Sequence, residues 1–244
     1  MAEQLRGAVV TGSSLGIGAA IARRLAQDGF GVVIDYHTHA DPANALRDAI
    51  TQAGGRATVM QADVAQLADL RRLIDTCVQS FGGIDVLVNN AGIEHPTPFL
   101  DIAEADFDAQ LAVDLKGPFF ATQYAAKQMI AQGGGGKIIN ISSVHEDLPM
   151  VGNVPYCCAK GGLRMFTRTV ASELAPHAIT IVNIGPGAIA TPINAATLAD
   201  PQKSAALLGS IPLHRIGQPS DVANLVSWLA SDQATYLTGT TIFI

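Results

Sequence analysis

Short apolar runs, many of them β-branched, alternate along the chain with longer segments in which apolar residues recur at helical spacing. The runs are continuously apolar, a pattern typical of strands buried on both faces of a parallel sheet. They predict strands at residues 8–11, 31–34, 57–60, 84–88, 137–141, 179–184 and 240–244. The segments between them predict helices at residues 19–25, 44–53, 67–81, 107–113 and 119–129, and another that starts at Pro155. This alternation indicates an α/β fold in which helices cover both faces of a parallel sheet through right-handed connections.

The C-terminal part of the chain has a less regular pattern. Ser220 and Asp221 predict the start of a final helix that ends at Ala230, with Pro219 just before it. Residues 194–209 lack a strand pattern and carry mixed helical character, so we expect a lid over the substrate, with a plain surface excursion as the alternative. Since no linker, repeat or low-complexity segment interrupts the chain, we expect a single domain over residues 1–244.

A glycine-rich turn, TGSSLGIG, joins the first predicted strand to the first predicted helix. Gly12 permits a tight turn, Gly16 lets the backbone approach a pyrophosphate, and Gly18 allows close helix packing. This is the context that a phosphate-binding loop requires, because a helix N-terminus favours an anion. The GxxxGxG spacing differs from the commoner GxGxxG, and a purely structural glycine turn is the alternative.

The second predicted strand leads to Asp35, Tyr36 and His37, where the adenosine ribose of a dinucleotide would lie. An acidic group there suits a ribose 2′-hydroxyl and repels a 2′-phosphate. The chain also has no arginine or lysine between Arg24 and Arg47. These features favour NAD, while His37 and His39 could partly serve a phosphate and leave NADP as a possible cofactor.

The stretch SSVHEDLPMVGNVPYCCAK carries the candidate catalytic residues Ser143, Tyr156 and Lys160. Tyr156 and Lys160 are four residues apart, so on a helix both project from one face. A tyrosine has an unperturbed pKa of about 10, and a neighbouring cation lowers it, which would let Tyr156 donate and accept a proton. Ser143, at a strand end, would hold a substrate oxygen. The alternatives are a turn serine, a packing tyrosine and a solvated lysine.

Composition narrows the classes of function. The chain has 244 residues, of which 48% are hydrophobic and 24 are glycine, as expected for a folded globular protein. A net charge of −6 without a basic stripe argues against a nucleic-acid partner. No signal-peptide pattern or long apolar stretch occurs, so we expect a cytoplasmic protein without a membrane partner. Cys77, Cys157 and Cys158 have neither metal-binding nor disulfide spacing, and we expect no metal.

In their order along essentially the whole chain, the glycine-rich turn, NNAG, Ser143, Tyr156, Lys160 and the later PG resemble the short-chain dehydrogenase/reductase family. The resemblance implies a Rossmann-type doubly wound sheet of seven parallel strands, a nicotinamide cofactor, hydride transfer at a carbinol or carbonyl carbon, and a homotetramer. It implies that Ser143 orients the carbonyl oxygen, Tyr156 is the acid/base, and Lys160 lowers the tyrosine pKa and holds the nicotinamide ribose.

The motifs and the resemblance together predict a cofactor site whose residues come from many segments between Gly12 and Thr191. It comprises Gly12, Ser14, Leu15, Gly16, Ile17, Gly18, Asp35, Tyr36, His37, Asp63, Val64, Asn90, Ala91, Gly92, Tyr156, Lys160, Pro186, Gly187, Ile189 and Thr191. The resemblance also implies that Asn89 lines the cofactor.

Within the family, the stretches GIEHP, SSVHE, NIGPGAIATPINA and LADP resemble the bacterial glucose 1-dehydrogenase group, which oxidises β-D-glucose to the lactone. This resemblance points to Glu94 and His145 as sugar contacts, although both could simply stabilise loops. Several polar groups must converge on a sugar. The predicted substrate residues are Glu94, Ser143, His145, Asn194 and Asp200, with Glu146 as a further candidate.

Two other functions fit the same motifs. A 3-oxoacyl or ketone reductase would be distinguished by a large apolar cleft. A non-catalytic regulator that senses NAD(P) would belong to another class of protein, and the complete set of Ser143, Tyr156 and Lys160 argues against it.

Asp114 departs from the family pattern, in which the corresponding segment carries an asparagine. We therefore assign Asp114 a catalytic role: its charge would pair with Lys160, weaken the pull of the lysine on Tyr156 and alter the proton relay. The alternative is that Asp114 only caps the helix that starts near Pro118.

Overall fold

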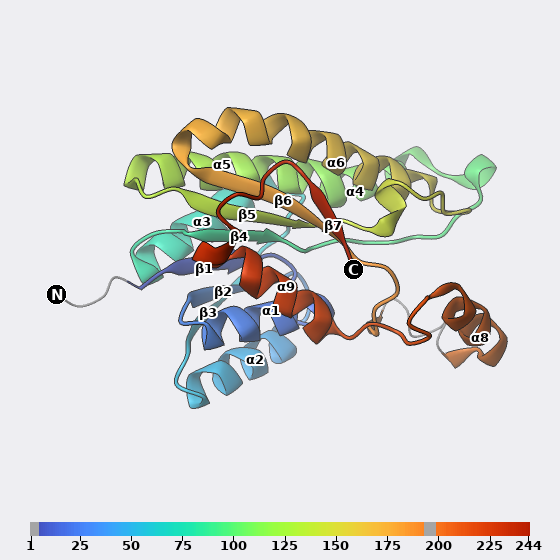
Figure 1. Ribbon diagram of the computed structural model, residues 1–244, viewed down its shortest axis with the longest axis horizontal. Coiled ribbons are helices and arrows are strands. Elements are labelled where there is room, and N and C mark those ends of the chain that lie inside the picture. The colour runs from blue at the N-terminus through green and yellow to red at the C-terminus, as the bar shows by residue number, and fades with distance from the viewer. Residues whose placement is uncertain (1–4, 193–198) are drawn as a thin grey trace.

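Seven parallel strands form the central sheet of the computed structural model, which describes residues 5–192 and 199–244 (Figure 1). The strand order is β3-β2-β1-β4-β5-β6-β7, and every neighbouring pair is parallel. The strands are β1 (Gly7–Val10), β2 (Gly31–Tyr36), β3 (Arg56–Gln61), β4 (Val86–Asn89), β5 (Gly136–Ile141), β6 (Ile179–Gly185) and β7 (Thr241–Phe243). The predicted doubly wound sheet is confirmed, and the order reverses between β1 and β4, where such folds open a crevice for ligands.

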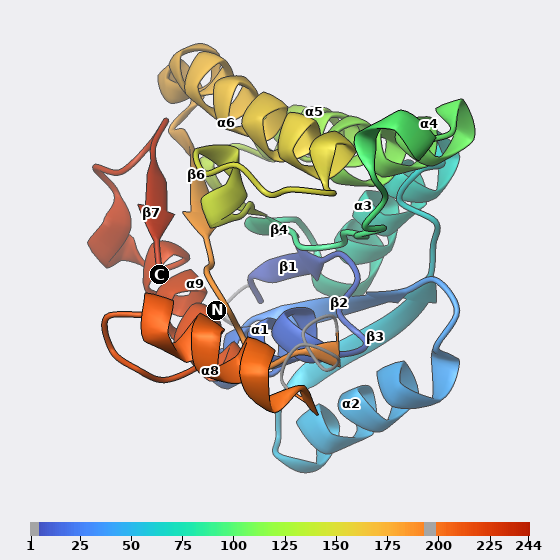
Figure 2. The ribbon, with the colours of Figure 1, turned by 90° about the vertical axis from the view of Figure 1, so that its right-hand side faces the viewer.

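Helices cover both faces of the sheet, as predicted (Figures 1 and 2). One face packs on α1 (Gly16–Gln27), α2 (Ala40–Gln52) and α9 (Pro219–Leu229). The other packs on α3 (Leu67–Phe81), α5 (Gly117–Gln132) and α6 (Val154–Leu174). Each face of the sheet has its own hydrophobic core, and alternate residues of a strand pack into one core or the other. Val10 lies in the first core and Val9 in the second, both with 0% exposure. This two-sided burial explains why the strands are continuously apolar.

A π-helical turn, Ala112–Lys116, separates α4 (Glu104–Leu111) from α5. Pro118 lacks the N–H that would continue the regular helical ladder, and the N–H of Gly117 instead reaches the carbonyl of Ala112. The gap between the predicted helices at residues 107–113 and 119–129 falls at this place. The turn directs Asp114 into the interior of the protein, where its exposure is 0%.

The C-terminal helices differ in detail from the prediction. Gln218, not Ser220, precedes the first residue of α9, and Pro219 occupies the first helical position, which a proline tolerates well. Asp221 accepts a hydrogen bond from the Gln218 N–H at 2.8 Å. In the predicted lid, α8 (Pro201–Ser210) lies at one end of the molecule, while residues 193–198, including Asn194, lie outside the described residues (Figure 1). None of the described helices has the length and apolar character needed to span a bilayer.

Candidate active site

The glycine-rich turn between β1 and α1 packs directly against the NNAG segment. Gly12 has a φ of +58°, and a Cβ there would lie 2.9 Å from the Cα of Ala91. A Cβ on Gly18 would lie 2.5 Å from Nδ2 of Asn90. That amide donates to the carbonyls of Thr11 and Gly12 at 2.9 and 3.0 Å, which fixes the shape of the turn. A turn held this tightly before a helix N-terminus fits the pyrophosphate of a dinucleotide.

Other residues expected to bind the cofactor come from the segment after β6 and from several loops. Thr191 approaches it directly, since a Cβ on Gly16 would lie 3.7 Å from its Cγ2. The N–H of Val144 donates to the carbonyl of Pro186 at 3.1 Å, which ties the end of β6 to the segment after β5. The others differ in exposure: Leu15 and Gly187 are exposed, Ser14, Ile17 and Asp63 are half-buried, and Val64 and Ile189 are buried.

Asn89 does not line the cofactor crevice. Its exposure is 3%, and its Nδ2 donates to Oγ1 of Thr122 at 3.2 Å and to Oδ1 of Asn140 at 2.8 Å. The side chain is therefore part of the buried interior beneath the site.

Asp35 lies in a different environment from the one that the sequence suggested. It is 1% exposed, its Oδ2 accepts from the N–H of Gly12 at 2.8 Å, and its Oδ1 has no hydrogen-bond partner among the described residues. Burial raises the pKa of Asp35 to about 7. The hydrogen bond from the Gly12 N–H lowers this pKa, and the negative charges of Asp69 and Asp63 raise it. The carboxyl group therefore supports the glycine turn from below, and the half-buried Tyr36 and exposed His37 form the outer end of β2.

The raised pKa of Asp35 predicts a pH-dependent stability. A carboxyl whose pKa is about 7 in the folded protein, against an ordinary value of 3.8, favours folding while it is protonated. Its contribution is present below pH ~4 and is lost as the pH rises through about 7, by up to ~1.4 kcal/mol per pH unit. We expect urea unfolding from pH 5 to 8 to show Asp35→Asn gaining stability over the wild type as the pH rises. Parallel pH curves for the two proteins would contradict this.

Ser143, Tyr156 and Lys160 come from two elements that pack together, the segment after β5 and helix α6. Ser143 is 5% exposed, and its Oγ accepts from the N–H of His145 at 3.1 Å, which starts a short 3₁₀ helix, Val144–Glu146. On α6, Pro155 occupies the first turn, and the Nζ of Lys160 lies 5.4 Å from the centre of the Tyr156 ring. The predicted helix thus holds the amine beside the phenol.

Lys160 and Asp114 form a buried ion pair. Nζ lies 3.0 Å from Oδ1 of Asp114 and donates to the carbonyl of Ile141 at 3.1 Å, and the two side chains are 5% and 0% exposed. Burial alone would lower the pKa of Lys160, but Asp114 and then Tyr156 outweigh it, so that the pKa is raised. Lys160 is therefore a cation at neutral pH, paired as the sequence suggested.

Asp114 has two further partners, and neither belongs to a cap of α5. Its Oδ2 accepts from the N–H of Ile93 at 3.1 Å and from Nε2 of Gln110 at 2.8 Å. Gln110 also donates to the carbonyl of Ile93 at 2.7 Å. Sequence reasoning missed Gln110, although its spacing of four residues from Asp114 on a helix was visible.

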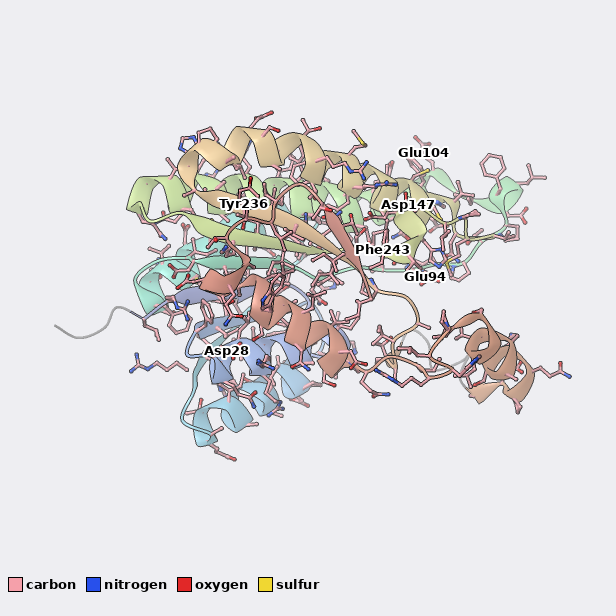
Figure 3. All side chains as sticks on the ribbon, in the orientation of Figure 1. Asp28, Glu94, Glu104, Asp147, Tyr236 and Phe243 are labelled. Carbon is pink, nitrogen blue, oxygen red and sulfur yellow. The ribbon has the colours of Figure 1, made fainter. Side chains whose placement is uncertain are left out.

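The predicted substrate residues have different environments. Glu94 and His145 are half-buried. Glu94 directly follows Ile93, whose N–H donates to Asp114, and the N–H of His145 donates to Oγ of Ser143. Nδ1 of His145 lies 3.2 Å from the carbonyl of Leu148. Asp200 instead caps α8 by accepting from two backbone N–H groups, those of Gln202 and Lys203. Asn194 lies outside the described residues. Figure 3 shows Glu94, Asp147 and Phe243 toward the end of the sheet where the strands finish.

Comparisons with known proteins match this chain along nearly its full length. A family model described as enoyl-(acyl carrier protein) reductase matches residues 12–244. A 3beta-hydroxysteroid dehydrogenase from Eggerthella lenta is 43% identical over 100% of this chain and 94% of the relative. Glucose 1-dehydrogenase 2 from Bacillus subtilis is 37% identical over 97% of this chain and 92% of the relative.

Solved structures agree with the same assignment. An acetoin dehydrogenase from Salmonella typhimurium superposes with a TM-score of 0.89 at 38% identity, covering 98% of this chain and 94% of that structure. The chain therefore belongs to the short-chain dehydrogenase/reductase family and is an oxidoreductase of that family.

Proposed function

We propose that this enzyme oxidises a secondary alcohol, or reduces the corresponding ketone, with Ser143, Tyr156 and Lys160 as its catalytic residues. The observation that carries the proposal is the buried ammonium of Lys160, held 5.4 Å from the centre of the Tyr156 ring on the helix that packs against the Ser143 segment. A fixed cation stabilises the negative charge that a phenol develops when it gives up its proton.

The chain's own groups would divide the work as follows. Tyr156 takes the hydroxyl proton of the alcohol or returns it to the ketone oxygen, and the hydroxyl of Ser143 holds that oxygen in place. Lys160 stabilises the phenolate and holds the cofactor ribose. The glycine turn, whose shape Asn90 fixes, would hold the pyrophosphate end, and the cofactor would supply the acceptor or donor of the hydride exchanged at the substrate carbon.

We propose NAD as the preferred cofactor, with NADP accepted less well. The absence of arginine and lysine between Arg24 and Arg47 supports this, because nothing with a fixed positive charge follows β2 to bind a 2′-phosphate. Asp35 contributes no ribose contact to this preference, since it is 1% exposed beneath the turn. The exposed His37 is the group on which weaker NADP binding would depend.

Two substrate classes have support. A glucose-like sugar is favoured by the half-buried polar side chains of Glu94 and His145 and by the glucose dehydrogenase relative. A less polar ketone or hydroxysteroid is favoured by the segment between Ser143 and Tyr156, where Leu148 is 57% and Val151 101% exposed, and by the hydroxysteroid dehydrogenase relative. The other predicted polar groups help little, because Asp200 caps a helix and Glu146 is buried away from solvent.

A single panel tests the function, the substrate and the cofactor together. The absorbance of the reduced nicotinamide would be followed with NAD and NADP in turn, against glucose, polyols, acetoin, a hydroxysteroid and a 3-oxoacyl ester. We expect turnover with at least one alcohol and a higher kcat/KM with NAD. Cofactor binding without turnover of any compound would favour the regulator that senses NAD(P).

Asp114→Asn should shift the pH dependence of that turnover. Asp114 raises the pKa of Lys160 against the lowering effect of burial, so removing its charge lets the lysine lose its proton at a lower pH. We expect the limbs of the kcat/KM profile to move to lower pH, with activity altered but not abolished. Superimposable profiles of the variant and the wild type would remove Asp114 from the mechanism.

We also propose that the enzyme is a cytoplasmic homotetramer, with residues 194–209 covering the substrate. On the α5–α6 surface, Phe119 and Met165 are 41% and 58% exposed, and Phe119 contacts the Phe166 ring at 5.1 Å between centres. Met129, on the same helix as Phe119, is instead buried in the core. Sedimentation that shows only monomer would contradict the tetramer.

A further inference from the structure

A buried carboxylate, Glu146, lies three residues after Ser143 and joins four elements. Its Oε2 accepts from Oγ of Ser142 at 2.5 Å and from Nδ2 of Asn183, on β6, at 3.3 Å. Its Oε1 accepts from Oγ1 of Thr241, on β7, at 2.5 Å. The side chain itself is 0% exposed, so these donors replace water as its partners.

The fourth element is α6, the helix that carries Tyr156 and Lys160. Nε of Arg164 lies 3.8 Å from Oε1 of Glu146, and the same guanidinium pairs with Asp147. Arg164 follows Lys160 by four residues, which places both on one face of α6. Glu146 therefore connects the segment that carries Ser143 to the helix that carries Tyr156 and Lys160.

We propose that Glu146 is a positioning residue that fixes the Ser143 hydroxyl relative to Tyr156. Ser143 belongs to a short turn whose only regular element is the 3₁₀ helix Val144–Glu146, and its Oγ caps that helix. Glu146 is the last residue of this turn, and Ser142, just before Ser143, donates to its carboxylate, so the side chain of Glu146 links the two ends of the turn. Because a carboxylate accepts at both oxygens, it holds donors from both sides at once. A glutamine has one acceptor oxygen and does not.

The buried polar side chains on the far side of Asn183 provide a matched control within the same network. Asn140 donates to Oγ1 of Thr167 at 2.9 Å and to Oδ1 of Asn183 at 3.1 Å, and Thr167 donates to Oδ1 of Asn183 at 2.6 Å. Thr167 is 1% exposed, and among the described residues its hydroxyl bonds to Asn140 and Asn183 rather than to the Ser143 turn. Thr167→Val therefore removes two buried hydrogen bonds of the same network and leaves every direct partner of Glu146 in place.

The test compares Glu146→Gln, Thr241→Val, their double variant and Thr167→Val. We expect Glu146→Gln to lower kcat between about 10-fold and about 100-fold, the effect of a small displacement in a catalytic group, with little change in cofactor Kd. Thr241→Val should cause a smaller loss, and no further loss in the double variant, because both changes break the same contact. Thr167→Val should lower Tm while kcat stays near that of the wild type.

The inference rests on the proposed function, so a readout without turnover separates the two. Amide hydrogen exchange across residues 142–153 should become faster in Glu146→Gln and not in Thr167→Val. If exchange behaves this way but no alcohol is oxidised by the wild type, the proposed function fails while the positioning contact stands. Equal kcat and equal exchange in Glu146→Gln and Thr167→Val would overturn the role of Glu146.

Discussion

Replacement of Tyr156 by phenylalanine is expected to lower kcat by about 10³-fold, within the range of roughly 10² to 10⁴ that a positioned acid/base contributes. The phenylalanine ring keeps the shape of the side chain and the position beside Nζ of Lys160, 5.4 Å from the ring centre. What disappears is the hydroxyl that exchanges a proton with the substrate. The measurement is steady-state turnover with the best alcohol from the panel.

Nucleotide binding provides the control for this variant. The glycine turn and Asn90 are held by their own hydrogen bonds to Thr11 and Gly12, so the Kd for NADH should change little in Tyr156→Phe. Turnover within about threefold of the wild type would overturn the assignment of Tyr156 as the acid/base, because the loss of a general acid should lower turnover by far more than that.

Replacement of Lys160 by methionine should have the largest effect on stability. The lysine is buried, and its removal leaves Asp114 as a buried carboxylate without its cation, 0% exposed. Breaking one side of such a pair costs about 3 to 5 kcal/mol. Turnover should fall as well, because the phenolate loses its neighbouring charge. The free energy of unfolding in urea measures the first effect and steady-state kinetics the second.

The double variant Asp114→Asn with Lys160→Met separates these two consequences. An asparagine still accepts from the N–H of Ile93 or from Gln110 without carrying a charge. We therefore expect most of the lost stability to return while turnover stays low. A Lys160→Met protein as stable as the wild type would show that the ion pair does not stabilise the fold.

The sequence predicted the fold well because its strands are buried on both faces. Continuous apolar runs such as 84–88 and 179–184 are typical of strands in the interior of a parallel sheet. The predicted helices and strands match those of the structure to within a few residues at their ends. Boundaries were less certain where a terminus depends on one backbone group. Pro219, for example, begins α9 although it was expected just before the helix.

The candidate site was predictable only where residues act through the local chain. Tyr156 and Lys160 are one helical turn apart, so their proximity follows from the sequence. The direction of a side chain at a strand end does not follow from the sequence. Asp35 and Tyr36 point to opposite faces of the sheet, and the Asp35 carboxyl is buried against the glycine turn. Contacts between distant elements, such as Glu146 with Thr241, have no local signature at all.

The short strand β7 joins the sheet only through β6, and from it Thr241 reaches a carboxylate 95 residues earlier in the chain. Contacts between such distant positions form late, since the intervening chain must first be ordered. During refolding, helical content should therefore recover before catalytic competence. The last element to dock would be the one that brings the Thr241 hydroxyl to Glu146, next to the turn that carries Ser143.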